Sequence, residues 1–155
     1  MRWFDEVTAG IQYAPIRIPV SEEPVEISPS WAAWNGNHIE YVFDGYDWDT
    51  IQGWKTPGET AVWRLDVQSP GVYRVVLTYG CRLVDQGGVV ELHCGSIEPL
   101  RHTIRPTATA DQFESVEIGA MELSPGEQEL SASVIECPGR ELMRLNRVKL
   151  VRESP

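Results

Sequence analysis

The chain has 155 residues, a formal net charge of −10 and a hydrophobic content of 42%. This length suits a single domain, and the negative charge argues against a nucleic-acid partner, because phosphates require a basic surface. The 13 glycines and 11 prolines are spread along the chain, which indicates a globular protein with many turns. No apolar run approaches the roughly 20 residues of a membrane span, so we expect no membrane partner.

The chain begins MRWFDEVTAG, which lacks the basic and apolar regions of a secretory signal. We therefore expect either an intracellular protein or a module of a longer chain. Residues 1–23 show no clear hydrophobic period, and Pro15 and Pro19 limit any helix. We interpret this segment as an extended N-terminal arm, followed by one domain over residues 24–155.

From residue 25 onward, short segments alternate between apolar and polar residues and are separated by turn residues. Each segment is expected to form a β-strand: 25–34, 38–43, 50–54, 59–67, 72–80, 88–94, 100–105, 113–123, 127–136 and 141–151. Regular short strands between turns predict an all-β antiparallel sandwich of the jelly-roll type. In the last strand the apolar positions change parity between Leu145 and Val148, which predicts a β-bulge.

The turn QSPG at residues 68–71 joins two of these strands. Its proline and glycine favour a tight reversal, so we expect the flanking strands to form an antiparallel hairpin with an aromatic inner face. If successive strands alternate in direction, this turn and residues 124–126 lie at one end of the sandwich. The longer polar loops then lie at the other end, where binding residues usually sit: 35–37, 54–58, 82–87, 106–112 and 138–140.

Tryptophans are candidates both for the core and for a binding surface. Trp63 shares the parity of the apolar residues in its strand, which predicts a core position. Trp54 lies at a loop edge, where its ring either faces a ligand or plugs the end of the sandwich. Trp31 and Trp34 are expected to point to opposite faces of one strand, so one of them is a weaker candidate platform.

The segment DGYDWD places Asp44, Asp47 and Asp49 close together, as in a calcium-binding loop. The central glycine and distant glutamate of the full loop signature are missing, which favours a solvated acidic turn. Tyr46 and Trp48 in the same segment are candidates for a second aromatic patch.

The chain has 3 cysteines, an odd number that cannot form a complete disulfide framework. Cys81 and Cys137 are the most plausible pair, because both follow strands that run in the same direction, but free thiols are favoured. His93 and Cys94 are adjacent on a strand and point to opposite faces, so they cannot bind one metal together. No motif supplies a nucleophile or a pair of positioned carboxylates, so we do not expect an enzyme.

The segments GWKTPGETAVWRLDVQSPGVYRVVLTY, VVELHCG, FESVEIGAMELSPGEQELSASV and LMRLNRVKLV follow one another in this order. Together they resemble the carbohydrate-binding modules of family 6 and family 35, which are jelly rolls of the galactose-binding-like group. Similar modules are appended to bacterial fucosidases and sulfatases. The resemblance implies a non-catalytic carbohydrate-binding module that is accessory to a glycan-processing enzyme. The alternative is a structural or protein-interaction sandwich that has lost its sugar site.

The resemblance also implies site residues. Trp54 matches the aromatic that stacks on a sugar ring, and Phe113 falls close to the second aromatic of that cleft. Arg144 stands where the family has an asparagine in its final strand. Arg105, Gln112 and Arg144 are the expected hydrogen-bond donors around the sugar.

A structural calcium site of the family corresponds here to Glu26, Ser28 and Asn146. Glu26 is the acidic residue among them, and calcium prefers several carboxylate oxygens. The expected donor set for calcium is therefore Glu26 and Asn146, and no other cofactor is expected.

Overall fold

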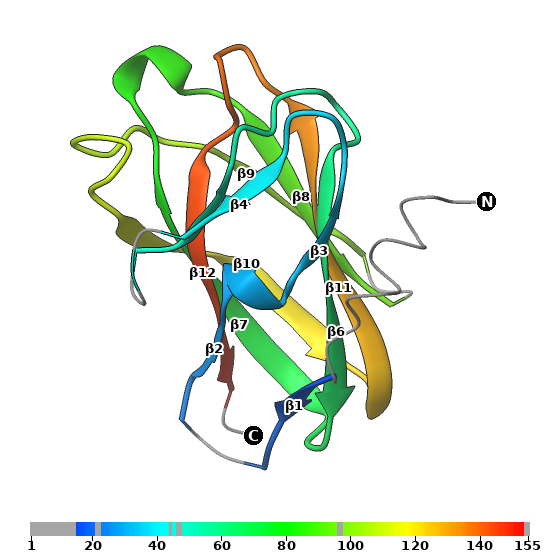
Figure 1. The fold of residues 1–155 in the computed structure, drawn as a ribbon. Coiled ribbons are helices and arrows are strands. Elements are labelled where there is room, and N and C mark those ends of the chain that lie inside the picture. Colours follow the sequence, from blue (N-terminus) through cyan, green and yellow to red (C-terminus); the bar gives the residue numbers. More distant parts are fainter. Residues whose placement is uncertain (1–14, 21–22, 44, 46–47, 96–97, 154–155) are drawn as a thin grey trace.

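The computed structural model describes residues 15–20, 23–43, 45, 48–95 and 98–153. Over these residues the chain forms two six-stranded sheets, which pack face to face as a sandwich (Figure 1). In the described ranges the helical segments are short 3-10 turns, η1 (Pro29–Trp31) and η2 (Leu83–Asp85), and no helix is long and apolar enough to cross a membrane. The predicted all-β jelly roll is confirmed.

The first sheet has the order β1-β6-β11-β8-β9, and β3 also pairs with β6, off this path. Its strands are β1 (Ile16–Ile18), β3 (Ala33–Asn35), β6 (Thr60–Val67), β8 (Val89–Cys94), β9 (Leu100–Thr103) and β11 (Gly126–Glu136). The second sheet has the order β10-β7-β12-β5-β4, and β2 pairs with β12. Its strands are β2 (Val25–Ile27), β4 (Glu40–Val42), β5 (Thr50–Gln52), β7 (Gly71–Gly80), β10 (Glu114–Leu123) and β12 (Arg144–Arg152).

The strands β6 and β7 do not pair with each other, so the predicted hairpin is wrong. β6 pairs with β1, β3 and β11 in the first sheet, whereas β7 pairs with β10 and β12 in the second. The turn at residues 68–70 therefore crosses between sheets, at the lower end in Figure 1. Tyr73 secures this crossing, because its buried hydroxyl donates to the carbonyl of Ser69. The predicted alternation is confirmed in both strands, which bury their apolar faces against one core from opposite sides.

Two predicted boundaries at the N-terminal side need correction. Residues 25–34 do not form one strand, because Pro29 starts the turn η1 and the Ser28 hydroxyl caps it by accepting from the amide of Ser30. β2 and β3 on either side of η1 consequently join different sheets. The sandwich also begins before residue 24, since β1 pairs in parallel with β6 and buries Ile18 completely.

The longer loops gather at the end drawn uppermost in Figure 1, as predicted. Hydrogen bonds tie them together there: the amide of Thr107 donates to the carbonyl of Cys81, and the amide of Leu142 donates to that of Trp54. We call this part of the molecule the loop end. The predicted bulge in the last strand is confirmed, because the register of β12 against β7 shifts between Leu145 and Arg147.

The core lies between the sheets and is built from the inward residues of both. Trp63 is buried there, as predicted, and its indole N–H donates to the carbonyl of Ser28 at 2.9 Å. Cys81, Cys94 and Cys137 are free thiols, so the Cys81–Cys137 pair is not formed in this structure. Burial raises the pKa of Cys94 to about 11, which makes its thiolate scarce near neutral pH.

Candidate functional site

Trp54, which the resemblance identifies as the stacking residue, is fully buried. Its indole N–H donates to the carbonyl of Met143 at 2.8 Å, and its own carbonyl accepts from the amide of Leu142 at 2.6 Å. Because the ring has no exposed face, it cannot stack on a sugar, and that prediction is wrong. The alternative interpretation, a plug at the end of the sandwich, is correct.

Glu59 explains why the loop that follows Trp54 keeps its shape. Its buried carboxylate accepts from the backbone amides of Lys55, Thr56, His38 and Ile39, at 2.7 to 3.1 Å. Burial alone would raise the pKa of Glu59, but these amides outweigh burial and lower the pKa to about 2. The carboxylate is therefore ionised and fixes two neighbouring loops of the loop end.

A second aromatic, Trp48, precedes β5 and forms a pair with Phe113. Trp48 is 56% exposed, and its ring centroid lies 5.7 Å from that of Phe113, with the ring planes tilted by 43°. Phe113 is half-buried and is a predicted site residue, whereas Trp48 was a candidate only as part of its own loop. The two residues are far apart in sequence, so no local pattern could have indicated their contact.

Phe113 reaches this position because the preceding loop crosses closely over Gly80. A Cβ atom on Gly80 would lie 2.1 Å from the carbonyl oxygen of Ala110 and 3.2 Å from the Phe113 ring. Only glycine leaves room for this backbone approach. Gly80 also pairs with Arg144 across β7 and β12, so Phe113 and Arg144 have Gly80 as a common neighbour.

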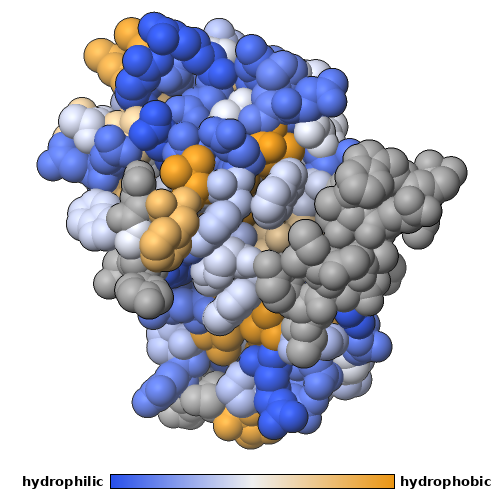
Figure 2. Space-filling model, in the orientation of Figure 1, coloured by the Kyte–Doolittle hydropathy of each residue, from blue (hydrophilic) through white to orange (hydrophobic). Residues whose placement is uncertain are grey.

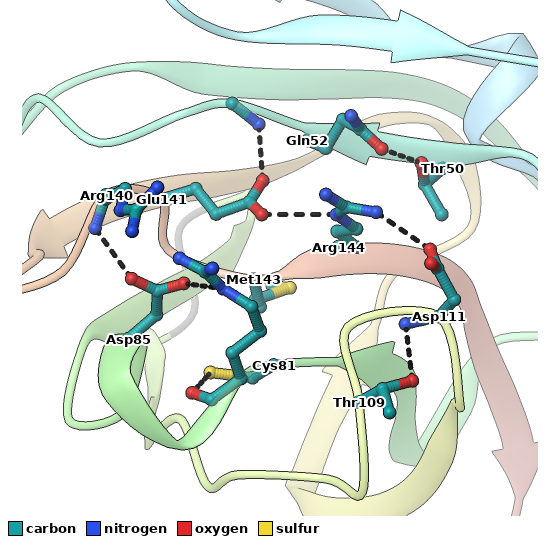
Figure 3. A network of polar contacts seen from close by, with 12 residues as sticks. Thr50, Gln52, Cys81, Asp85, Thr109, Asp111, Arg140, Glu141, Met143 and Arg144 are labelled. Atoms are coloured by element: carbon teal, nitrogen blue, oxygen red, sulfur yellow. Dashed lines mark hydrogen bonds and ion pairs between the residues drawn. The ribbon is translucent and has the colours of Figure 1, made fainter.

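Arg144 begins β12 and lies between two carboxylates, as Figure 3 shows. Its Nη1 donates to Oδ1 of Asp111 at 2.7 Å, and its Nε donates to Oε2 of Glu141 at 3.1 Å. Burial alone would lower the pKa of Arg144, but the two carboxylates outweigh burial and raise it. The guanidinium is therefore charged and held in one orientation. Asp111 and Glu141 had not been predicted as its partners.

Further polar residues lie near Arg144 or next to Phe113 in the chain. Thr50 and Gln52 lie on β5 beside Arg144 (Figure 3), and the Thr50 hydroxyl donates to the Gln52 side-chain oxygen at 2.8 Å. Gln112 precedes Phe113 and is exposed. Arg105 is also exposed and begins the loop that leads to Gln112. Its backbone amide donates to the hydroxyl of Tyr79. The structure thus gathers Phe113, Gln112 and Arg144 and does not link Arg105 to them.

The residues expected to bind calcium have other partners. Glu26 is exposed on β2 and lies opposite Lys149 of β12. Asn146 is buried in the bulge, and its amide nitrogen donates to the carbonyl of Asp49 at 2.8 Å. Glu26 is exposed with a lysine as its cross-strand neighbour, and Asn146 is buried with its amide N–H donated to a carbonyl, so this donor set fits calcium badly.

The carboxylate nearest to Asn146 is already neutralised by an arginine. Asp49 is buried, and its Oδ1 accepts from Nη1 of Arg147 at 2.8 Å, while its Oδ2 accepts from the Tyr41 hydroxyl at 3.0 Å. Among the described residues no group of three or more histidine, cysteine or acidic side chains is arranged to hold a metal. Asp44 and Asp47 of the predicted acidic turn lie outside the described residues, as does Tyr46. Calcium binding stays a prediction.

Other aromatic residues lie along the edge where β3 and β4 run. Trp34 and Tyr41 are stacked, with centroids 6.5 Å apart, and both are half-buried, Trp34 against the core. Trp31 lies on η1 and is 42% exposed, whereas Trp34 lies on β3. The prediction that the two residues point to opposite faces of one strand is therefore wrong. In Figure 2, side chains of neutral or hydrophobic character gather over this middle part of the face, and hydrophilic ones dominate above it.

Compared by sequence, the chain matches no protein family and no curated protein. Its structure is similar to that of a family 35 carbohydrate binding module from Clostridium thermocellum, with a TM-score of 0.65 and 15% identity over 84% of this chain and 99% of that one. It is also similar to the module CBM6cm-2 from Cellvibrio mixtus lichenase 5A in complex with cellotriose, with a TM-score of 0.64 and 13% identity over 84% and 98% of the two chains. The insecticidal crystal protein Cry2Aa is similar over 88% of this chain but 22% of its own, with a TM-score of 0.69 and 15% identity. At such low identities these likenesses establish the jelly-roll fold, and function has to be argued from the site.

Proposed function

We propose that this protein is a non-catalytic carbohydrate-binding module that holds a sugar against the aromatic pair of Trp48 and Phe113. The observation that carries the proposal is the position of Trp48, which is 56% exposed and tilted against Phe113. Sugar rings present apolar faces, and an exposed indole offers a flat apolar surface that matches them. The fold shared with carbohydrate-binding modules of family 35 and family 6 supports the same function.

The polar groups around the pair complete the site. Sugar hydroxyls both donate and accept hydrogen bonds, and Arg144, Asp111 and Gln112 provide donors and acceptors next to Phe113. Binding sites commonly combine aromatic walls with a few placed polar groups of this kind. Arg105, the remaining expected donor, reaches a bound sugar only if that sugar extends along its loop.

Truncation of the platform tests the proposal. A glycan array first identifies a bound sugar, and calorimetry then compares the wild type with Trp48→Ala. We expect Trp48→Ala to weaken binding about tenfold or more, as at other aromatic anchors. Trp31→Ala is the matched control, because Trp31 is also an exposed tryptophan and lies on η1 rather than against Phe113. An unchanged affinity of Trp48→Ala, with a loss in Trp31→Ala, would move the site to the β3 and β4 edge.

The module is further proposed to serve a glycan-processing enzyme, such as a fucosidase or a sulfatase. One similar structure is a module of a lichenase, which shows how such a sandwich can accompany a catalytic domain. The gene that encodes this chain provides the test. A catalytic domain for glycans encoded in the same protein supports the accessory role, and a protein without one contradicts it.

A structural or protein-interaction domain without sugar binding is the second candidate. The burial of Trp54 favours it, because the position of the expected stacking residue is part of the core. No binding to any glycan at millimolar concentration would support this candidate over the first.

A further inference from the structure

We infer that the site selects uncharged sugars and disfavours anionic ones, such as uronates and sulfated sugars. This inference rests on the proposed function and concerns the charge of the ligand. Its basis is Arg144, which pairs with Gly80, the glycine that the Phe113 ring lies against, and whose guanidinium is already bound by Asp111 and Glu141.

Glu141 is a partner that an incoming anion cannot easily displace. Its side chain is 14% exposed, and while Oε2 binds Arg144, Oε1 accepts from the amide of Gly53 at 2.9 Å. Removal of Glu141 from the guanidinium would therefore strain a second hydrogen bond, to the loop that holds Trp54. Asp111 is different, because its side chain is 74% exposed and its carboxylate is bound through one oxygen to Arg144.

Two further acidic residues, Glu114 and Glu40, lie close to this cluster in the chain or across the strands. Glu114 follows Phe113 in the chain and is exposed, and Glu40 lies opposite Gln52 on the neighbouring strand β4. The nearest further arginine on β12, Arg147, is held by the buried carboxylate of Asp49. An anionic sugar would thus have to displace Asp111 and then remain close to Glu141, inside a protein whose net charge is −10.

A neutral sugar avoids this competition. Its hydroxyls can donate to the outer carboxylate oxygen of Asp111 and accept from Arg144 while the ion pair stays intact. The paired charges then act as a fixed set of donors and acceptors for hydroxyls. Asp111 is accordingly the residue that sets the charge preference, because its loss frees Arg144 to bind an anion.

Matched pairs of sugars test the inference. The array contains neutral gluco-, galacto-, manno- and xylo-oligosaccharides together with the corresponding uronate and sulfate forms, and the best pair is titrated by calorimetry. For the wild type we expect the neutral member to bind about tenfold tighter than the anionic one. Because a neutral ligand forms no ion pair, its affinity should also change little between low and high sodium chloride.

Asp111→Asn isolates the cause of the preference. We expect this variant to bind the anionic member about tenfold tighter than the wild type does, with a smaller change for the neutral member. Glu114→Gln is the control, because it removes a negative charge beside Phe113 without freeing Arg144, and it should shift the ratio much less. Equal shifts in the two variants would contradict the role given to the Arg144 pair.

The outcomes separate this inference from the proposed function. Tighter binding of the anionic member by the wild type overturns the inference and leaves a carbohydrate-binding module. Binding of neither member, by the wild type or by Asp111→Asn, overturns the proposed function itself and the inference with it.

Discussion

Two tryptophans flank the short strand β5, and their surroundings differ completely. Trp54, after the strand, is 0% exposed, whereas Trp48, before it, is 56% exposed. Trp54 belongs to a loop whose backbone is fixed by Glu59 and whose indole N–H has an acceptor in the carbonyl of Met143. Trp48 contacts the ring of Phe113 and leaves much of its own ring in water. The position of a tryptophan at a loop edge therefore does not by itself show whether its ring is available to a ligand. The ring of Trp54 is buried with its N–H bonded to a backbone carbonyl, and the ring of Trp48 is exposed.

Truncation of each tryptophan should give the largest contrast. Trp54→Ala removes a fully buried indole and leaves the carbonyl of Met143 without its donor. We expect a loss of about 3–5 kcal/mol in the free energy of unfolding, measured by urea denaturation. Trp48→Ala should cost less than about 1 kcal/mol, because its ring is mostly in water. Similar losses in the two variants would contradict the distinction between plug and platform.

The ion pair beside Trp48 provides the next test. Asp49 is buried, and Arg147 is its cationic partner at 2.8 Å. Arg147→Ala leaves a buried carboxylate uncompensated, so we expect the free energy of unfolding to fall by about 3 kcal/mol. Arg64→Ala is the control, since Arg64 pairs with Glu127 on the surface and its removal should cost little. A small loss in Arg147→Ala would mean that Asp49 is not anchored through this pair.

On the Trp54 side of β5, the corresponding anchor is Glu59. Glu59→Gln places an amide N–H₂ group among backbone donors, so we expect a loss of roughly 2–3 kcal/mol at neutral pH. The pKa of Glu59 is lowered from 4.5 to about 2 in the folded protein, so its contribution is complete above pH 4.5 and is lost as the pH falls toward 2. Urea denaturation at several pH values should therefore show the wild type converging on Glu59→Gln in acid. A constant difference between them would contradict the lowered pKa.

The sequence predicts the strands of this fold well, because alternation in β6, β7, β8 and β11 reports burial on one face directly. It does not predict which strands pair. A tight turn such as residues 68–70 serves equally for a hairpin and for a crossing between sheets, and the choice depends on strands such as β11 and β12 that come much later in the chain.

The candidate site shows the same limit. The turn pattern alone predicts that Gln112 lies at the loop end, whereas Phe113 and Arg144 were expected from the family resemblance. Their contacts depend on long-range approaches, including the passage of the Ala110 carbonyl over Gly80. The burial of Trp54 likewise depends on a carbonyl of residue 143, far away in sequence. The role of the predicted residues in sugar binding stays a prediction, and the contact of Phe113 with Trp48 is new from the structure.

The smallest effect on stability is expected at Asp111, whose side chain is exposed, as that of Trp48 is. Its side chain is 74% exposed, and its ion pair with Arg144 is therefore screened by water and salt. We expect Asp111→Asn to change the free energy of unfolding by no more than about 0.5 kcal/mol, measured in the same urea series. Glu141→Gln should cost more, because Glu141 is 14% exposed and also binds the amide of Gly53 in the loop of Trp54. If Asp111→Asn destabilised the protein as much as Glu141→Gln, Asp111 would belong to the framework that holds Trp54. If its effect is small, Asp111 is free to serve the ligand, and changes in binding by Asp111→Asn report on the site itself.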